Sequence, residues 1–313
     1  MNEFEIIEKF FIAGEAGRGV RTGIGDDCAV LQPTANERLV VTTDTLVENV
    51  HFPPSSPPEK LGYRSCATAL SDIAAMGGKA LWASLALTLP KVEERWMARF
   101  VSGFNSALAI DDTSLVGGDL TQGPFTITWH ITGTAPNSGP LLRSGGLIGD
   151  DIYVSGNLGG AAYALEFLNS DDVKRALLEP YWYPHPRLEL GRAIAPFATS
   201  CIDISDGFLG DLGHILRQSR VAAELDIGRL PVHSNLDKLS DNTATSIALN
   251  GGDDYELCFT APSRSRVELD SLNKTVEPRL TRVGKIVAAD EEAYVPRSTE
   301  GELLQAISYR HFE

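Results

Sequence analysis

The stretch "RLVVTTDTLV", residues 38–47, gives the first indication of the fold. Its valines, threonines and leucines are residue types enriched in β-strands, so the stretch predicts a strand, with Asp44 near its end. A second acidic group, Asp26 and Asp27, lies shortly before it in "GIGDDCAVL", residues 23–31. Both stretches place carboxylates beside apolar segments, and a solvated surface does not require that arrangement.

Hydrophobic periodicity outward from this strand predicts further elements in the N-terminal half. Apolar residues at helical spacing predict amphipathic helices, and the glycine pair at 77–78 is a typical helix end. The segment "FTITWHITGTAP" alternates apolar and polar residues, which predicts a strand with one buried face. The segment "TSLVGGDL" predicts a short strand that ends in a glycine turn. The predicted helices cover residues 3–11, 57–78 and 94–110, and the predicted strands cover residues 38–47, 113–120 and 125–136.

A segment rich in proline, glycine and serine, "APNSGPLLRSGGLIGDD", divides the chain and predicts a domain boundary. We therefore expect two domains, residues 1–138 and 139–313. The second half mixes strands and helices without strict β-α-β order, so the predicted fold class is mixed α/β (α+β). Its predicted strands cover residues 151–156, 200–207, 222–228 and 255–262, and its predicted helices cover residues 158–168 and 209–219.

Composition narrows the classes of function. The 313 residues carry a formal net charge of −15, which argues against a basic surface for nucleic acids. The four cysteines have small or apolar neighbours and no metal or disulfide spacing, so we expect buried free thiols in a reducing compartment. We see no signal peptide at the start and no apolar run of about 18 residues that could span a membrane. The sequence therefore predicts a cytoplasmic protein.

Many aspartates lie beside glycine or at the predicted ends of strands and helices. If they converge, their repulsion requires cations, and oxygen-only ligands favour magnesium, manganese or calcium. Magnesium held by carboxylates is typical of phosphate chemistry. A single Gly-Asp pair is more often a turn, and the alternative for Asp72 is a solvent-facing helix position. Phosphate-binding loops of the GxxxxGK[ST] type and kinase HRD and DFG motifs are absent from the sequence.

Eight motifs in order make the chain resemble the thiamine-monophosphate kinase family, within the superfamily of aminoimidazole ribonucleotide synthetase and selenophosphate synthetase. They are "GIGDDCAVL", "TTDTLVENVHF", "ALSDIAAMGG", "LTLP", "VGGDLTQGP", "RSGGLIGDDIYVSG", "DISDGFLGDLGHI" and "GGDDYELCFT". The resemblance implies two α/β domains, and a homodimer whose N-terminal sheets form a shared barrel. It also implies an active site between the domains near the dimer interface. The implied reaction transfers phosphate from ATP to thiamine monophosphate with several magnesium ions, and gives thiamine diphosphate.

The resemblance also implies roles for single residues. Metal ligands would be Asp27, Thr42, Thr43, Asp44, Asp72, Asp119, Asp203 and Asp206. ATP contacts would be Gly118, Asp119, Arg143 and Ser205, and substrate contacts would be His51, Asp253 and Tyr309. The family pattern at Asp253 is Gly-Gly-Glu-Asp, whereas this chain reads Gly-Gly-Asp-Asp, one methylene shorter. Because a phosphate monoester is already anionic near neutral pH, with a second pKa of about 6, no general base is expected.

Two alternatives remain at this stage. Another enzyme of the superfamily is possible, although a reactive cysteine with a lysine in a glycine-rich N-terminal segment, as in selenophosphate synthetase, is missing from the sequence. A non-catalytic nucleotide or metal sensor with the same fold is the second alternative. Protein that binds ATP without turnover would favour the sensor, whereas turnover would favour an enzyme.

Overall fold

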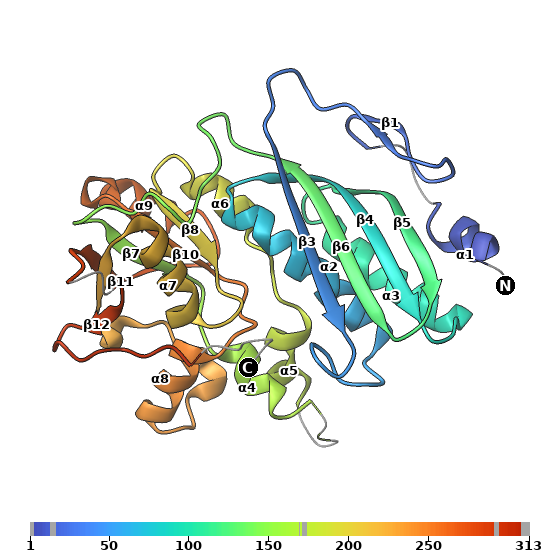
Figure 1. Cartoon of the computed structure of the whole chain (residues 1–313). Helices are drawn as coiled ribbons and strands as arrows, with labels where there is room; N and C mark the ends of the chain where they lie inside the picture. Colours follow the sequence, from blue (N-terminus) through green and yellow to red (C-terminus); the bar gives the residue numbers. More distant parts are fainter. Residues whose placement is uncertain (1–2, 13–16, 169, 171–173, 291–293, 308–313) are drawn as a thin grey trace. The chain divides into compact units, whose positions relative to one another are not determined.

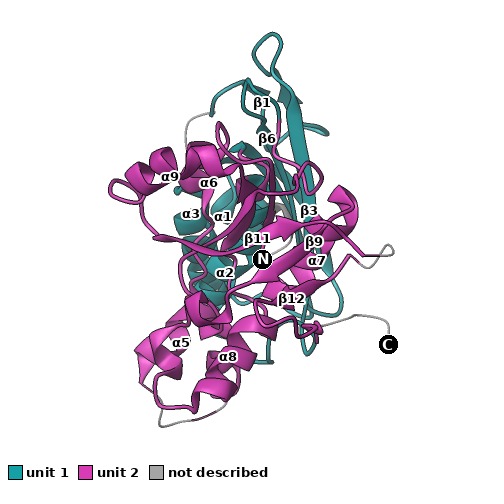
Figure 2. Cartoon of the chain, turned by 90° about the vertical axis from the view of Figure 1, so that its left-hand side faces the viewer, with its two compact units in different colours: residues 1–73, 78–139 teal, residues 74–77, 140–313 magenta. Residues whose placement is uncertain are grey.

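The computed structural model describes residues 3–12, 17–168, 170, 174–290 and 294–307. Within it the chain forms two compact units, shown in two colours in Figure 2. Unit 1 comprises residues 1–73 and 78–139, and unit 2 comprises residues 74–77 and 140–313. Each unit is built around its own β-sheet, and Figure 1 labels their elements.

Unit 1 contains a four-stranded sheet in the order β3-β6-β4-β5. β3 pairs antiparallel with β6, β6 antiparallel with β4, and β4 parallel with β5. Two long helices, α2 and α3, lie along one face of this sheet (Figure 1). The elements of unit 1 are α1 (Glu3–Phe10), β1 (Val20–Thr22), β2 (Val30–Leu31), β3 (Leu39–Val47), α2 (Pro58–Ala75), β4 (Lys79–Leu89), α3 (Glu94–Leu108), β5 (Ser114–Gln122) and β6 (Thr126–Thr134).

The two faces of the unit 1 sheet differ in polarity. Ile127, Trp129 and Ile131 on β6 are fully buried, as their alternation with polar residues predicts. The intervening positions on β6 include Thr128 and His130, which lie on the opposite, more accessible face. We call this second surface the open face. The alternation therefore directs one face of the sheet toward the hydrophobic core and leaves the other polar.

Two strands of unit 1 differ from expectation. The glycine turn predicted within "TSLVGGDL" is wrong, because β5 continues through Gly117 and Gly118 to Gln122. A Cβ atom on Gly118 would lie 2.0 Å from the carbonyl oxygen of Leu85, so glycine here permits close strand pairing. We predicted no strand at β4, where residues 80–83 are buried in succession and buried residues alternate with more accessible ones only from Ala83 to Leu89.

Unit 2 contains a six-stranded sheet in the order β12-β9-β11-β7-β10-β8. Its neighbours are antiparallel except for β12 and β9. Helix α7 packs on the sheet through a continuous apolar cluster that includes Ile202, Phe208 and Leu212. The strands and helices are β7 (Asp151–Ser155), α4 (Gly160–Leu165), α5 (Arg175–Trp182), α6 (Leu188–Ile194), β8 (Ser200–Asp203), α7 (Phe208–Ser219), β9 (Ala222–Leu225), α8 (Asp241–Asn250), β10 (Leu257–Ala261), α9 (Arg266–Leu272), β11 (Leu280–Val287) and β12 (Pro296–Ser298).

The cysteines follow the prediction with one exception. All four are free, and Cys66, Cys201 and Cys258 are buried. Cys28 is exposed, so its predicted burial is wrong: it lies in the irregular loop between β1 and β2, outside any packed element. Among the described residues, no helix is long and apolar enough to cross a membrane.

Candidate active site

Strand β3 and helix α2 bring three of the predicted metal ligands to the buried face of the unit 1 sheet. Thr42 Oγ1 donates a hydrogen bond of 2.5 Å to Asp72 Oδ2. One turn earlier on α2, Thr68 Oγ1 donates to Asp44 Oδ2 at 2.8 Å. Asp72 is therefore directed at β3, and the solvent-facing alternative for it is wrong. Asp44 lies inside β3 rather than at its end, so its orientation follows from strand alternation.

Asp119 and Thr43 lie on the other side of the same sheet. Asp119 is exposed on β5, where its Oδ2 accepts a 2.9 Å hydrogen bond from Thr121 Oγ1. Thr43 Oγ1 lies 3.0 Å from His130 Nδ1 on the open face. The strand register separates Asp44 from Gly118 by three strand spacings, or about 14 Å. One copy of unit 1 therefore does not bring Asp119 to Asp44.

Two further predicted residues of unit 1 lie in turns. Asp27 is exposed in the loop between β1 and β2, and its backbone N–H donates to Asp26 Oδ1 at 2.9 Å. Asp26 thus shapes this turn. His51 follows β3, and its Nδ1 accepts a 3.0 Å hydrogen bond from the backbone N–H of Val47. That bond fixes the ring orientation of His51.

The two acidic motifs of unit 2 meet at one edge of its sheet. Asp203 is the last residue of β8 and pairs with Leu257 at the start of β10. Beyond the paired strands, the backbone N–H of Asp253 donates to the carbonyl of Ser205 at 2.8 Å. The "DISDG" and "GGDDYE" segments thus run side by side, and the structure brings Asp203, Ser205 and Asp253 to one place. Asp206, the next residue after Ser205, is exposed there.

A buried carboxylate in the first turn of α7 holds the "DISDG" segment. Asp211 Oδ2 accepts hydrogen bonds from the backbone N–H groups of Ser205, at 2.9 Å, and Asp206, at 3.0 Å. Burial, and after it the neighbouring Asp203 and Asp206 charges, raise the pKa of the Asp211 carboxyl to about 8, although these two donors lower it. A bound cation near these carboxylates would oppose that rise.

The backbone of Arg143 lies near the opposite end of α7 from this edge. Its carbonyl accepts a 3.3 Å hydrogen bond from Ser219 Oγ, in the last turn of α7, whereas Ser205 and Asp206 precede the first turn. The helix of 12 residues between them spans about 18 Å. The Arg143 side chain, however, is directed along α7: burial and the charges of Arg217 and Arg143 lower the pKa of His214, and the charge of Asp206 raises it. Tyr309 lies outside the described residues.

The donor chemistry of these groups fits a hard divalent cation. Asp44 and Asp72 with Thr42 on unit 1, and Asp203 and Asp206 on unit 2, offer only oxygen atoms. Oxygen ligands select magnesium, manganese or calcium. Within the described ranges, no group of three or more His, Cys, Asp or Glu side chains is close enough to hold a metal ion. The predicted set is divided between the two units.

The structure also shows supporting residues that the sequence patterns missed. Thr68 lies four residues before Asp72, which places both on the same side of α2, so helical spacing could have suggested it. Asp211 follows the "SDG" turn by four residues, a spacing that offers a similar hint. His130 is held by a partner far away in sequence, and no local signal indicates it. Asp254 lies in the motif "GGDDYELCFT", but its partner at residue 159 has no local signal.

Comparisons with known proteins now define the class and the family. Residues 25–135 match the model of the AIR synthase related protein, N-terminal domain, which gives the class of this part of the chain. Over 295 residues the chain is 42% identical to the thiamine-monophosphate kinase of Haemophilus influenzae. The aligned region covers 91% of this chain and 89% of the relative. The chain belongs to the thiamine-monophosphate kinase family, and it is a kinase. The resemblance inferred from the eight motifs is confirmed.

Solved structures agree with this placement. The crystal structure of thiamine-monophosphate kinase from Stenotrophomonas maltophilia K279a is 40% identical and superposes with a TM-score of 0.85, covering 92% of this chain and 93% of the other. A structure described as AaThiL complexed with AMPPCP and TMP is 27% identical and superposes with a TM-score of 0.79. The superposition covers 90% of this chain and 89% of the other. The mixed α/β fold predicted from the sequence is therefore confirmed.

Proposed function

We propose that this protein transfers the terminal phosphoryl group of ATP to thiamine monophosphate and produces thiamine diphosphate. The observation that carries the proposal is the likeness, across nine-tenths of the chain, to an AaThiL complexed with AMPPCP and TMP. The oxygen-rich groups on β3 and α2, and at the end of β8, support it. Phosphoryl transfer depends mainly on positioning and on charge stabilisation, for which such groups are suited.

We assign the metal ligands as the resemblance implies. Asp27, Thr42, Thr43, Asp44, Asp72 and Asp119 on unit 1, together with Asp203 and Asp206 on unit 2, would hold several magnesium ions. Magnesium, when bound, screens the repulsion between two phosphates and stabilises the charge of the transferred group. Thr68 orients the Asp44 carboxylate, and Asp211 orients the turn that carries Asp206.

The remaining assignments concern the two substrates. Gly118, Asp119, Arg143 and Ser205 would contact ATP, and His51, Asp253 and Tyr309 would contact thiamine monophosphate. His51 is held by the backbone of Val47, and Asp253 by the backbone of Ser205. Both side chains therefore come from backbone with little freedom, which favours precise placement of a bound molecule.

We propose direct in-line transfer without a phosphoenzyme. An oxygen of the acceptor phosphate forms a bond to the γ-phosphorus of ATP, and the bond between this phosphorus and the β,γ-bridging oxygen breaks to release ADP. The acceptor phosphate is already anionic near neutral pH, because its second pKa is about 6. No side chain has to remove a proton, and the chain's residues hold both phosphates in line.

An assay of turnover tests this function. Purified protein with ATP, MgCl₂ and thiamine monophosphate is expected to form thiamine diphosphate, measured by chromatography. Omission of magnesium, and free thiamine in place of the monophosphate, are both expected to abolish product. Folded protein that binds ATP but forms no product would contradict the proposal and favour the sensor. Product from free thiamine would contradict the assigned acceptor.

We further propose a cytoplasmic homodimer in which two copies of the unit 1 sheet pair through their open faces. Leu39 and Val41, on β3, support this arrangement, because they are 47% and 56% exposed although they belong to a regular strand. Sedimentation at micromolar concentration is expected to give twice the chain mass of 33.8 kDa. A single-chain mass at that concentration would contradict the dimer. The three buried free thiols are consistent with a reducing compartment.

A further inference from the structure

The "GGDDYE" segment of unit 2 is paired along its length with the "DISDG" segment. In addition to the bond from Asp253, the backbone N–H of Tyr255 donates to the carbonyl of Ile204 at 2.8 Å. The N–H of Ile204 in turn donates to the carbonyl of Glu256 at 2.7 Å. A Cβ atom on Gly252 would lie 2.3 Å from the Ser205 carbonyl oxygen, so the two segments are in direct contact.

The backbone of this segment has an uncommon conformation. Asp253 has a φ of 70° and Tyr255 a φ of 50°, both in the left-handed region that non-glycine residues seldom occupy. Such a conformation is strained and persists only where the surroundings enforce it. Two strained residues with Asp254 between them therefore require strong anchors nearby.

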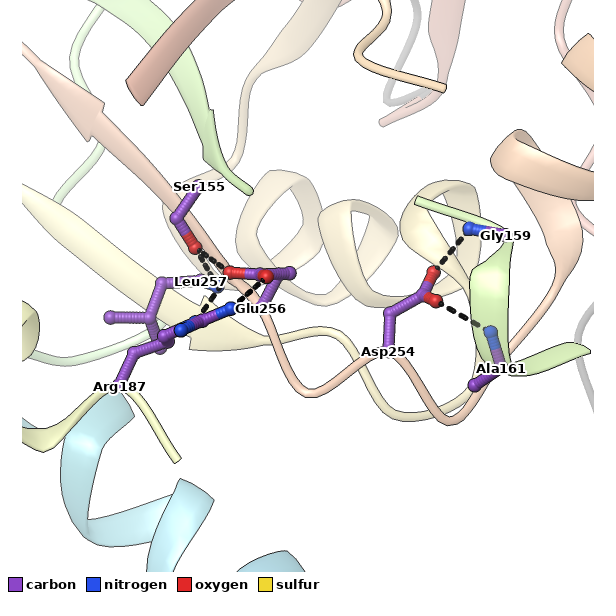
Figure 3. Close-up of polar contacts among 7 residues, drawn as sticks. All are labelled: Ser155, Gly159, Ala161, Arg187, Asp254, Glu256 and Leu257. Carbon is purple, nitrogen blue, oxygen red and sulfur yellow. Dashed lines mark hydrogen bonds and ion pairs between the residues drawn. The ribbon is translucent and has the colours of Figure 1, made fainter. Parts of the chain in front are cut away.

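Asp254 and Glu256 are these anchors (Figure 3). Asp254 Oδ2 accepts a 2.7 Å hydrogen bond from the backbone N–H of Gly159, and Oδ1 lies 3.4 Å from the N–H of Ala161 at the start of α4. The pKa of the Asp254 carboxyl is raised to about 8, mainly by burial, although both donors lower it. The buried Glu256 carboxylate forms an ion pair with Arg187.

Asp253, by contrast, has a side chain turned toward a polar group of its own segment. The Tyr255 hydroxyl donates to Asp253 Oδ1 at 3.2 Å. The segment therefore directs Asp254 to α4 and keeps the Asp253 carboxylate beside Tyr255. If Asp254 lost its contact with α4, the strained backbone at Asp253 and Tyr255 could relax.

We propose that Asp254 is a positioning residue, which holds the Asp253 carboxylate at the acceptor-substrate site by anchoring its segment to the start of α4. The inference rests on the proposed function, because it assigns Asp253 to the acceptor, thiamine monophosphate. It adds a residue that does not itself touch substrate. Because the Asp254 side chain bonds the start of α4 and not Ser205, which is assigned to ATP, its loss is expected to affect acceptor binding more than nucleotide binding.

Steady-state kinetics of Asp254→Ala test this role. The variant loses both hydrogen bonds and is expected to raise KM for thiamine monophosphate about tenfold or more, with KM for ATP within about twofold of wild type. Asp254→Asn can still accept from Gly159, so it is expected to recover most of the acceptor affinity. Asp253→Ala should reproduce the same selective rise. The exposed Asp270→Ala, the same change in the same unit, should leave both constants unchanged.

Several results would overturn the inference. An unchanged acceptor KM in Asp254→Ala, or an equal rise in both KM values, would show that Asp254 has only a structural role. If Asp254→Ala fails to fold, Asp254→Glu decides, because it keeps the acceptor oxygens but displaces the segment by one methylene. It is expected to show the same selective rise, and an unchanged acceptor KM would refute the proposal. Wild-type protein without turnover would instead overturn the proposed function, and this inference with it.

Discussion

Asp44→Asn is expected to reduce turnover by about 1,000-fold or more, with the fold intact. A direct metal ligand contributes several kcal/mol to stabilising transferred phosphate, and an amide supplies no charge. The asparagine Oδ1 can still accept the hydrogen bond from Thr68 Oγ1, which is 2.8 Å from Asp44 Oδ2 in the wild type. The rate of thiamine diphosphate formation at saturating ATP and magnesium is the measurement.

Two comparisons make this result specific. Asp112→Asn is the same chemical change at an exposed turn with a φ of 53°, a conformation that asparagine tolerates, and wild-type turnover is expected. Thr68→Val removes the hydroxyl donor and is expected to lower activity about tenfold to 100-fold, as loss of an outer ligand-orienting group does. Asp44→Asn protein with more than a tenth of wild-type turnover would refute the assignment of Asp44 as a metal ligand.

Arg187→Met is expected to destabilise unit 2 by about 3–5 kcal/mol, because it leaves the buried carboxylate of Glu256 without its counter-ion. Arg187 binds Glu256 through two parallel contacts, Nε to Oε2 at 2.9 Å and Nη2 to Oε1 at 2.5 Å (Figure 3). Only 6% of the Glu256 side chain is exposed, so water cannot replace the arginine. Urea unfolding followed by circular dichroism measures the loss.

A second arginine pair in unit 2 provides a matched control. Asp151 is also buried, but it contacts both Arg266, at 2.6 Å, and Arg282, at 3.4 Å. Arg266→Met therefore leaves one counter-ion, and a loss of about 1 kcal/mol is expected. The double variant Arg187→Met with Glu256→Gln should recover most of the stability, because no buried charge remains. Equal losses for Arg187→Met and Arg266→Met would contradict this explanation.

Elements with a clear local period were predictable from the sequence. The helix expected at residues 57–78 is α2 (Pro58–Ala75), and the alternating segment at 125–136 is β6 (Thr126–Thr134). These patterns work because burial of one face imposes its own spacing on a helix or a strand. β4 was missed: its first part, residues 80–83, is buried on both faces, and the alternation that follows from Ala83 to Leu89 consists of small and apolar residues with little contrast in polarity.

The sequence by itself determined which elements have an apolar face, and it placed eight motifs, most of them acidic or glycine-rich, in the order of one enzyme family. The tertiary structure alone decided which way each carboxylate points. Asp44 and Asp119 both lie inside strands of unit 1. The Asp44 carboxylate accepts a hydrogen bond from Thr68 on α2, whereas Asp119 is exposed on the open face. Asp254 gains its partner from a residue 95 positions earlier. Local periodicity records burial, whereas such hydrogen bonds depend on how distant segments pack together.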